Sequence, residues 1–156
     1  MLLKQEKTLT ARAVAYLARR EYSRQELFQK LRGYLQEGQS VDDIDAVLDR
    51  LQEKGYLSDE RYAQVRARVR SDKFGNRRIA NELRDKGIKS EQVQVALNSI
   101  GESEFDRAWR VWQRKYSHCP QDAKEKARQI RYLAYRGFTF DVITQVLQQA
   151  QKEENN

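Results

Sequence analysis

Two adjacent residues, His118 and Cys119, are the side chains best suited to chemistry, and each is the only one of its type in the sequence. A nucleophilic cysteine needs a base beside its sulfur and a third group that orients the base. Side chains of adjacent residues usually point apart, and Pro120 marks a turn between helices. A metal site needs three or four ligands at recognisable spacing, which this region lacks. We predict no catalytic residue and no metal site; a thiol or metal enzyme would lose activity when either residue is changed.

Acidic residues and phosphate-binding loops offer no better candidate. Four carboxylates, at Asp42, Asp43, Asp45 and Asp49, crowd the start of one expected helix. Acids in a first turn complement the helix dipole, which explains them better than an acid/base pair does. The sequence contains neither a GxxxxGK[ST] loop nor a GxGxxG turn, so no nucleotide site is indicated. We therefore predict no cofactor, and look for function in binding.

The distribution of charge points to an anionic partner. The formal net charge is +7 and the sequence pI is about 9.6. Residues 61–89 sum to +7 and residues 104–136 to +5, whereas 1–60, 90–103 and 137–156 sum to −1, −2 and −2. Two basic blocks of this kind suit a large polyanion or an acidic protein groove.

Apolar residues recur at helical spacing, and the pattern repeats three times. Each repeat has a quartet at i, i+3, i+4 and i+7: Ile44, Val47, Leu48 and Leu51; Val93, Ala96, Leu97 and Ile100; Ile143, Val146, Leu147 and Ala150. The quartets are 49 and 50 residues apart, and a glycine lies six residues before each, at Gly38, Gly87 and Gly137. A period of this length is typical of an array of small helical units.

The repeat predicts an all-α fold of three tandem three-helix repeats. The expected helices cover 10–20, 24–36, 41–54, 59–72, 76–86, 91–100, 102–116, 122–136 and 140–151. The units are expected at 10–57, 58–101 and 102–151, followed by a polar tail at 152–156. A unit this small buries too little surface to be comfortably stable alone. Neighbouring units should therefore stack into an elongated array, whose curvature the sequence leaves open.

The first basic block falls on two consecutive expected helices. In 59–72, Tyr62, Val65 and Val69 form one stripe, flanked by Arg66 and Arg70. These two arginines lie four residues apart, where like charges disfavour a helix, and neither has an acid at helical spacing.

In 76–86, Arg77, Asn81 and Arg84 lie opposite Ile79 and Leu83. Arg78 has Glu82 four residues on, so an ion pair within the helix and a partner contact both remain open for it. Lys73 lies between the two helices.

The second block repeats this arrangement. One side of 102–116 carries three arginines and one side of 122–136 three cations: Arg107, Arg110 and Arg114, then Lys124, Arg128 and Arg131. Four aromatic residues line the opposite side of the first of these helices, at Phe105, Trp109, Trp112 and Tyr116. Rings can stack on bases, but a stripe that faces away from the charge is better explained as core. We predict that the cations of both blocks form a binding surface.

Several stretches resemble the RecX family of bacterial recombination regulators. The central unit has "GYLSDERYA" at 55–63 and "KFGNRRIANELRDKGI" at 73–88, the first has "REYSRQEL" at 20–27, and the third has "YRGF" at 135–138. The resemblance covers about residues 10 to 150, and its order and spacing are specific. Ser58 stands where an acid is common and Asn76 where proline can open the helix, which are conservative changes.

The resemblance implies three tandem three-helix units, in agreement with the repeat pattern. It also implies binding to RecA protein, within the helical groove of the RecA–DNA filament. Such binding would oppose filament growth and so lower strand exchange, ATP hydrolysis and co-protease action. The site residues would then be Arg66, Arg70, Lys73, Arg77, Arg84, Arg107, Arg110, Arg114, Lys124, Arg128 and Arg131. The alternative is a module that binds single- or double-stranded DNA directly, without RecA.

The ends of the sequence and its cysteine content bear on location. "MLLKQEKTLT" has three apolar residues before charge appears, too few for a signal-peptide core. No apolar run approaches the roughly 18 residues of a membrane span. A lone cysteine forms no internal disulfide, which suits a reducing compartment. We expect a cytoplasmic, monomeric protein without a membrane partner.

Overall fold

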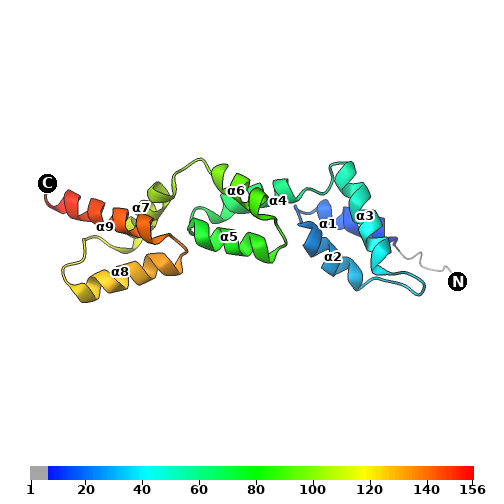
Figure 1. Cartoon of the computed structure of the whole chain (residues 1–156), viewed down its shortest axis with the longest axis horizontal. Coiled ribbons are helices and arrows are strands. Elements are labelled where there is room, and N and C mark those ends of the chain that lie inside the picture. The colour runs from blue at the N-terminus through cyan, green and yellow to red at the C-terminus, as the bar shows by residue number, and fades with distance from the viewer. Residues whose placement is uncertain (1–6) are drawn as a thin grey trace.

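A computed structural model of the chain describes residues 7–156, which form an elongated row of helices (Figure 1). The helices are α1 (Leu9–Leu17), α2 (Arg24–Arg32), α3 (Val41–Glu53), α4 (Asp59–Arg70), α5 (Asn76–Asp85), α6 (Ser90–Asn98), α7 (Glu104–Lys115), α8 (Ala123–Tyr135) and α9 (Phe140–Glu154). The described residues contain no strand. Three groups of three helices follow one another along the long axis, with α1–α3 at one end of the row and α7–α9 at the other. We call α1–α3 unit 1, α4–α6 unit 2 and α7–α9 unit 3, and the predicted array is confirmed.

Each unit has its own apolar core, built around the predicted quartet. The quartets on α3 and α9 are fully buried. Val93 and Ala96 of α6 are buried, whereas Leu97 and Ile100, which follows the end of α6, are partly buried against the same cluster. The aromatic stripe of α7 also belongs to a core: Trp112 is buried, and the other three rings pack against the unit 3 cluster. Both predictions are confirmed.

Serine caps explain where several helices begin. Ser23 accepts a hydrogen bond from the backbone N–H of Glu26 at 3.1 Å, and the Glu26 carboxylate accepts one from the Ser23 N–H at 3.0 Å. Ser58 and Ser103 cap α4 and α7 in the same way, without the reciprocal bond. Such a cap satisfies a backbone donor that has no partner within its own helix. The starts of α4 and α7, the first helices of units 2 and 3, are therefore determined by residues close together in the sequence.

An acid in the first turn of each following unit joins it to the unit before. Asp59 of α4 accepts from the backbone N–H of Arg24, the first residue of α2, at 2.8 Å. Glu104 of α7 accepts in the same manner from the N–H of Asn76, the first residue of α5, at 3.3 Å. The first N–H groups of a helix have no partner within it, and negative charge is favoured there. The two acids thus cap the second helix of the preceding unit.

The joint between units 2 and 3 also brings two backbones into contact. The N–H of Gly75 donates to the carbonyl of Arg136 at 2.9 Å, and that of Arg77 to the carbonyl of Gly137 at 3.0 Å. A Cβ on Gly75 would overlap the Gly137 carbonyl, and a Cβ on Gly137 would overlap the side chain of Arg78. Gly137 also has φ = +92°, a conformation that costs other residues about 1–2 kcal/mol. Only glycine permits this approach.

Most helix ends lie within two residues of their predicted positions. α1 and α2 end at Leu17 and Arg32, earlier than the predicted residues 20 and 36, and the last helix ends later than predicted. The prediction ended it at residue 151 and assigned 152–156 to a polar tail. α9 instead continues to Glu154, whose carboxylate accepts a hydrogen bond from the backbone N–H of Cys119 at 2.7 Å. This contact gives the last turn a tertiary partner that helical spacing alone does not reveal.

Candidate basic binding surface

The buried face of α4 differs from the predicted stripe. Tyr62, Ala63 and Ala67 are buried, whereas Val65 is exposed and Val69 is 61% exposed. Of the three residues that the sequence places on one stripe, Tyr62 alone is buried, and the two valines are exposed. Small alanines let α4 pack closely on α6, its principal neighbour, and the valines are left beside the arginines at the surface.

Arg70 and Arg78 enclose the ring of Phe74 and share one carboxylate. Each guanidinium carbon lies 4.1 Å from the ring centroid. Arg70 donates two hydrogen bonds to Glu82, at 3.0 and 2.7 Å, and Arg78 lies 3.5 Å from the same carboxylate. Desolvation raises the pKa of Glu82, but the hydrogen bonds and charges of the two arginines outweigh it and lower the pKa overall. The acid that Arg70 lacks within α4 thus comes from α5, and Arg78 does form the pair within its helix.

Arg66, Arg77 and Arg84 remain available at the surface. All three are exposed, and none has a carboxylate within 4.0 Å among the described residues. Arg84 makes one hydrogen bond, to the side chain of Asn81 at 3.3 Å. Arg77 and Arg84 lie about 100° and about 120° around α5 from Arg78, on the same side, since each residue of a helix turns by about 100°. The predicted cations of unit 2 therefore occupy two neighbouring stripes.

Arg107 does not belong to any binding surface, and its prediction as a contact residue is wrong. Its side chain is 1% exposed. It donates to the carbonyls of Phe74 at 2.8 Å and Ser71 at 3.4 Å, and to the side-chain oxygen of Asn76. Desolvation lowers its pKa, but an arginine stays charged. Arg107 joins unit 3 to the turn between α4 and α5, a role that its position on a basic stripe concealed.

The other two arginines of α7 are held by acids. Arg110 pairs with Glu102 and lies 3.5 Å from Asp72, while Arg114 lies 3.6 Å from Asp72. Asp72 is an acid within the first basic block, so its contacts link that block to the second. Such partly exposed pairs are weak, and they orient the two guanidinium groups without neutralising the whole surface.

The cations of α8 are free of ion pairs within the part of the chain that the structure describes. Lys124, Arg128 and Arg131 are all exposed, and no carboxylate lies within 4.0 Å of them. They belong to a different helix from Arg110 and Arg114, on the outer part of unit 3. Solvated cations of this kind can meet an anionic partner without first breaking an internal contact.

The joint between units 2 and 3 brings the two basic blocks together. A groove of about 560 Å³ lies there, and its cationic lining comes from both units: Lys73 and Arg78 from unit 2, Arg114 and Arg136 from unit 3. Of these, Lys73 and Arg114 were predicted site residues, Arg78 was left open and Arg136 was missed. The available signal for Arg136 was its place within "YRGF" at 135–138, beside the glycine that forms the joint.

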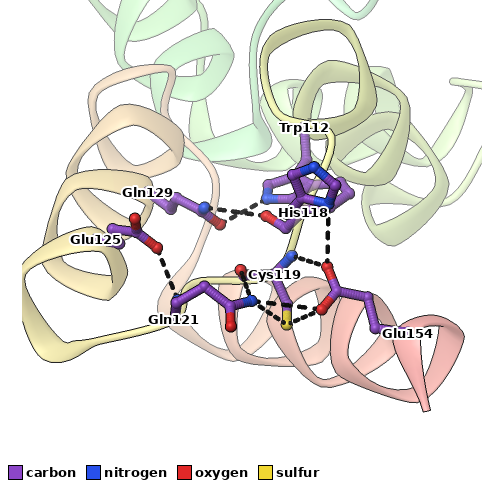
Figure 2. Close-up of polar contacts among 7 residues, drawn as sticks. All are labelled: Trp112, His118, Cys119, Gln121, Glu125, Gln129 and Glu154. Atoms are coloured by element: carbon purple, nitrogen blue, oxygen red, sulfur yellow. Dashed lines mark hydrogen bonds and ion pairs between the residues drawn. The ribbon is translucent and has the colours of Figure 1, made fainter.

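His118 and Cys119 do lie close to an acid, Glu154 (Figure 2). The thiol of Cys119 donates to the Glu154 carboxylate at 2.8 Å, which raises the pKa of the thiol. His118 Nδ1 lies 3.6 Å from the same carboxylate. Because the thiolate is the nucleophilic form, this arrangement works against reactivity. Within residues 7–156, no cluster of three or more His, Cys, Asp or Glu side chains is placed to hold a metal, so the contacts attach the α7–α8 loop to the end of α9.

Comparison with known proteins assigns the three units individually. Family models described as the first, second and third three-helix domains of RecX match residues 11–51, 58–97 and 102–147. The regulatory protein RecX of Chromobacterium violaceum is 44% identical over 141 residues, which cover 90% of each chain. The chain belongs to the RecX family. The regulatory protein RecX of Leptothrix cholodnii is 42% identical over 149 residues, or 96% of this chain and 93% of the relative.

The fold of the RecX family is also found in solved structures. The crystal structure of RecX from Lactobacillus salivarius superposes with a TM-score of 0.76 at 21% identity, covering 92% of this chain and 94% of the other. The matched relatives are named as regulatory proteins, which makes this chain a member of a family of regulators. No helix within residues 7–156 has the length and apolar character needed to span a membrane.

Proposed function

We propose that this RecX-family chain is a non-enzymatic, cytoplasmic regulator that binds RecA and the RecA–DNA filament. Binding inhibits filament extension, and with it strand exchange, ATP hydrolysis and co-protease activity. The chain acts as a monomer whose units contact successive parts of the filament. Several weak contacts along one elongated chain then give a higher affinity for the filament than any single contact would.

The observation that carries the proposal is the set of exposed cations that form no ion pair within the described part of the chain. Arg66, Lys73, Arg77 and Arg84 in unit 2 have no carboxylate within 4.0 Å among the described residues, and the same holds for Lys124, Arg128 and Arg131 in unit 3. Three further arginines, which are held in ion pairs, add positive charge: Arg70, Arg110 and Arg114. A fixed array of such charges suits the acidic surface and the phosphates of a protein–DNA filament.

A charge reversal on α5 tests the proposal. We compare R77E/R84E with the wild type in an assay of the DNA-dependent ATPase of RecA, with the chain added well below stoichiometry. Reversal of two exposed contacts should cost about 1–3 kcal/mol of binding, so half-inhibition should need about 5- to 150-fold more protein. The matched control is R32E/R50E, which reverses two exposed arginines of unit 1 that form no ion pair with any residue in 7–156. Equal inhibition by both variants and the wild type would remove α5 from the contact.

The alternative function is direct binding to DNA without RecA. The same unpaired cations favour it, since phosphates are the general partner of exposed arginine and lysine. Titration of duplex DNA alone at several salt concentrations separates the two functions. Tight binding with a steep salt slope, together with an unchanged RecA ATPase, would favour the alternative.

A further inference from the structure

The groove between units 2 and 3 combines cations with aromatic rings in one concave surface. It is lined by the four cations Lys73, Arg78, Arg114 and Arg136, and by no acid. Its volume of about 560 Å³ lies within the range of ordinary ligand sites. Both units must be docked for the groove to exist, because the α4–α5 turn and α5 supply one wall and α7 and α8 the other.

Two of the four cations are free to bind a ligand. Lys73 and Arg136 have no carboxylate within 4.0 Å among the described residues; the only protein acceptor for Arg136 is the backbone carbonyl of Lys73, at 3.4 Å. Arg78 and Arg114 lie 3.5 and 3.6 Å from single carboxylates, the long end of an ion pair. The groove therefore holds more positive charge than its own surroundings neutralise.

The rings of the groove are already arranged against guanidinium groups, with one exception. Phe74 is contacted by three arginines, and Arg136 also lies 5.3 Å from the centroid of Tyr132. Tyr135 differs, because it is 80% exposed and its one cationic neighbour, Arg78, is 5.8 Å from its ring centroid. No hydrogen bond holds its hydroxyl within the described residues. Most of the Tyr135 ring face is thus open to a planar ligand.

We propose that this groove is a binding site for single-stranded nucleic acid, with phosphates at Lys73 and Arg136 and one base stacked on Tyr135. Sites that bind single strands combine a positive groove along the backbone with aromatic rings on which bases stack. A duplex fits less well, because its bases are stacked on one another and cannot reach a ring at the side of a narrow groove. An acidic protein segment would use the cations but would leave Tyr135 without a planar partner.

The site deepens the alternative of direct DNA binding, because it specifies single strands and a residue on which a base stacks. It is tested without RecA, so it can fail separately from the proposed regulation of RecA. The probes are a fluorescein-labelled dT oligonucleotide of about 12 nucleotides and an abasic oligonucleotide of the same length, followed by fluorescence anisotropy. The decisive variant is Y135L, which removes the ring at an exposed position and leaves the fold unaffected. Its matched control is Y56L, since Tyr56 is a 60% exposed tyrosine in the α3–α4 turn of unit 1.

The wild type and Y56L should bind the dT probe about 5- to 150-fold more tightly than Y135L, which is the value of one stacked base. Y135L should bind the abasic probe as the wild type does, because only the base contact is lost. K73Q should weaken both probes and reduce the slope of log affinity against log salt by about 0.7, the value of one phosphate contact on a single strand.

Two results would overturn the site. If Y135L binds the dT probe as tightly as the wild type, no base stacks on Tyr135. If poly-glutamate of equal charge displaces the dT probe as well as unlabelled dT does, the groove is an electrostatic dock for an acidic protein. Circular dichroism of each variant at 222 nm should match the wild type, and Y56L shows whether loss of any exposed tyrosine has a general effect.

Discussion

Replacement of Arg107 by methionine measures how much the joint between units 2 and 3 depends on one buried guanidinium. The change leaves the carbonyls of Phe74 and Ser71 and the Asn76 side chain without their donor. A buried acceptor without a partner costs about 1–3 kcal/mol. The 3.4 Å bond to Ser71 is weak and Asn76 is partly exposed, so the three acceptors together amount to about 3–5 kcal/mol. Methionine keeps the packing of the methylene groups and removes a desolvated charge, which offsets about 1 kcal/mol of this cost. The free energy of unfolding should therefore fall by about 2–4 kcal/mol.

Urea unfolding, followed by circular dichroism and by tryptophan fluorescence, provides the measurement. Both tryptophans, Trp109 and Trp112, lie in unit 3, so their emission reports whether this unit separates before the others. The control is R110M, one turn away: Arg110 is 31% exposed in surface ion pairs, and its loss should cost about 0–1 kcal/mol. If R107M were as stable as R110M but failed to inhibit RecA, Arg107 would return to the binding surface and our account of the joint would be wrong.

Two further perturbations test the joint and the basic surface. G137A should lower the midpoint of thermal unfolding more than G38A, because both glycines have positive φ but only a Cβ at Gly137 overlaps a neighbour, whereas Gly38 faces open space. Equal shifts would show that the joint is not closely packed. Glu82 has a pKa lowered from 4.5 by Arg70 and Arg78, so its pairs stabilise the fold above that pH and are lost as the pH falls through the lowered value. The stability difference between wild type and E82Q should therefore shrink from pH 7 to pH 3 in urea titrations, and a constant difference would contradict the pairing.

The array could be predicted because its signal is local and repeated. Apolar quartets at 49- and 50-residue steps, each preceded by a glycine, identify the third helix of every unit. The serine caps fix the beginnings of α4 and α7 within four residues of sequence. The glycines before the quartets all adopt positive φ. Gly87 and Gly137 directly follow the caps of α5 and α8, where this conformation is common. Each of these features depends on neighbours along the chain, which a single sequence reveals.

The surface could not be predicted to the same degree, because its details depend on contacts between helices. The acceptors of Arg107 lie 31 to 36 residues before it, and the partner of Arg70 lies 12 residues after it on another helix. A helical projection places Arg107 beside Arg110 and Arg114 but cannot show that unit 2 covers only the first of them. The same limit explains Val65 and Val69, since the packing of α4 on α6 selects the alanine face instead.

The two joints of the array use the same acid cap but differ in what surrounds it. At the joint of units 1 and 2, Asp59 is accompanied by exposed contacts, such as the bond from Gln25 to the carbonyl of Asp85 at 2.8 Å. At the joint of units 2 and 3, Glu104 is accompanied by a buried arginine and a contact between two glycines. Buried contacts resist opening more than exposed ones do. The stiffer joint is therefore the one between the two basic blocks. A partner with regularly spaced anionic groups requires a fixed distance between these blocks. A substitution that loosens this joint should therefore weaken binding even when no contact residue is changed.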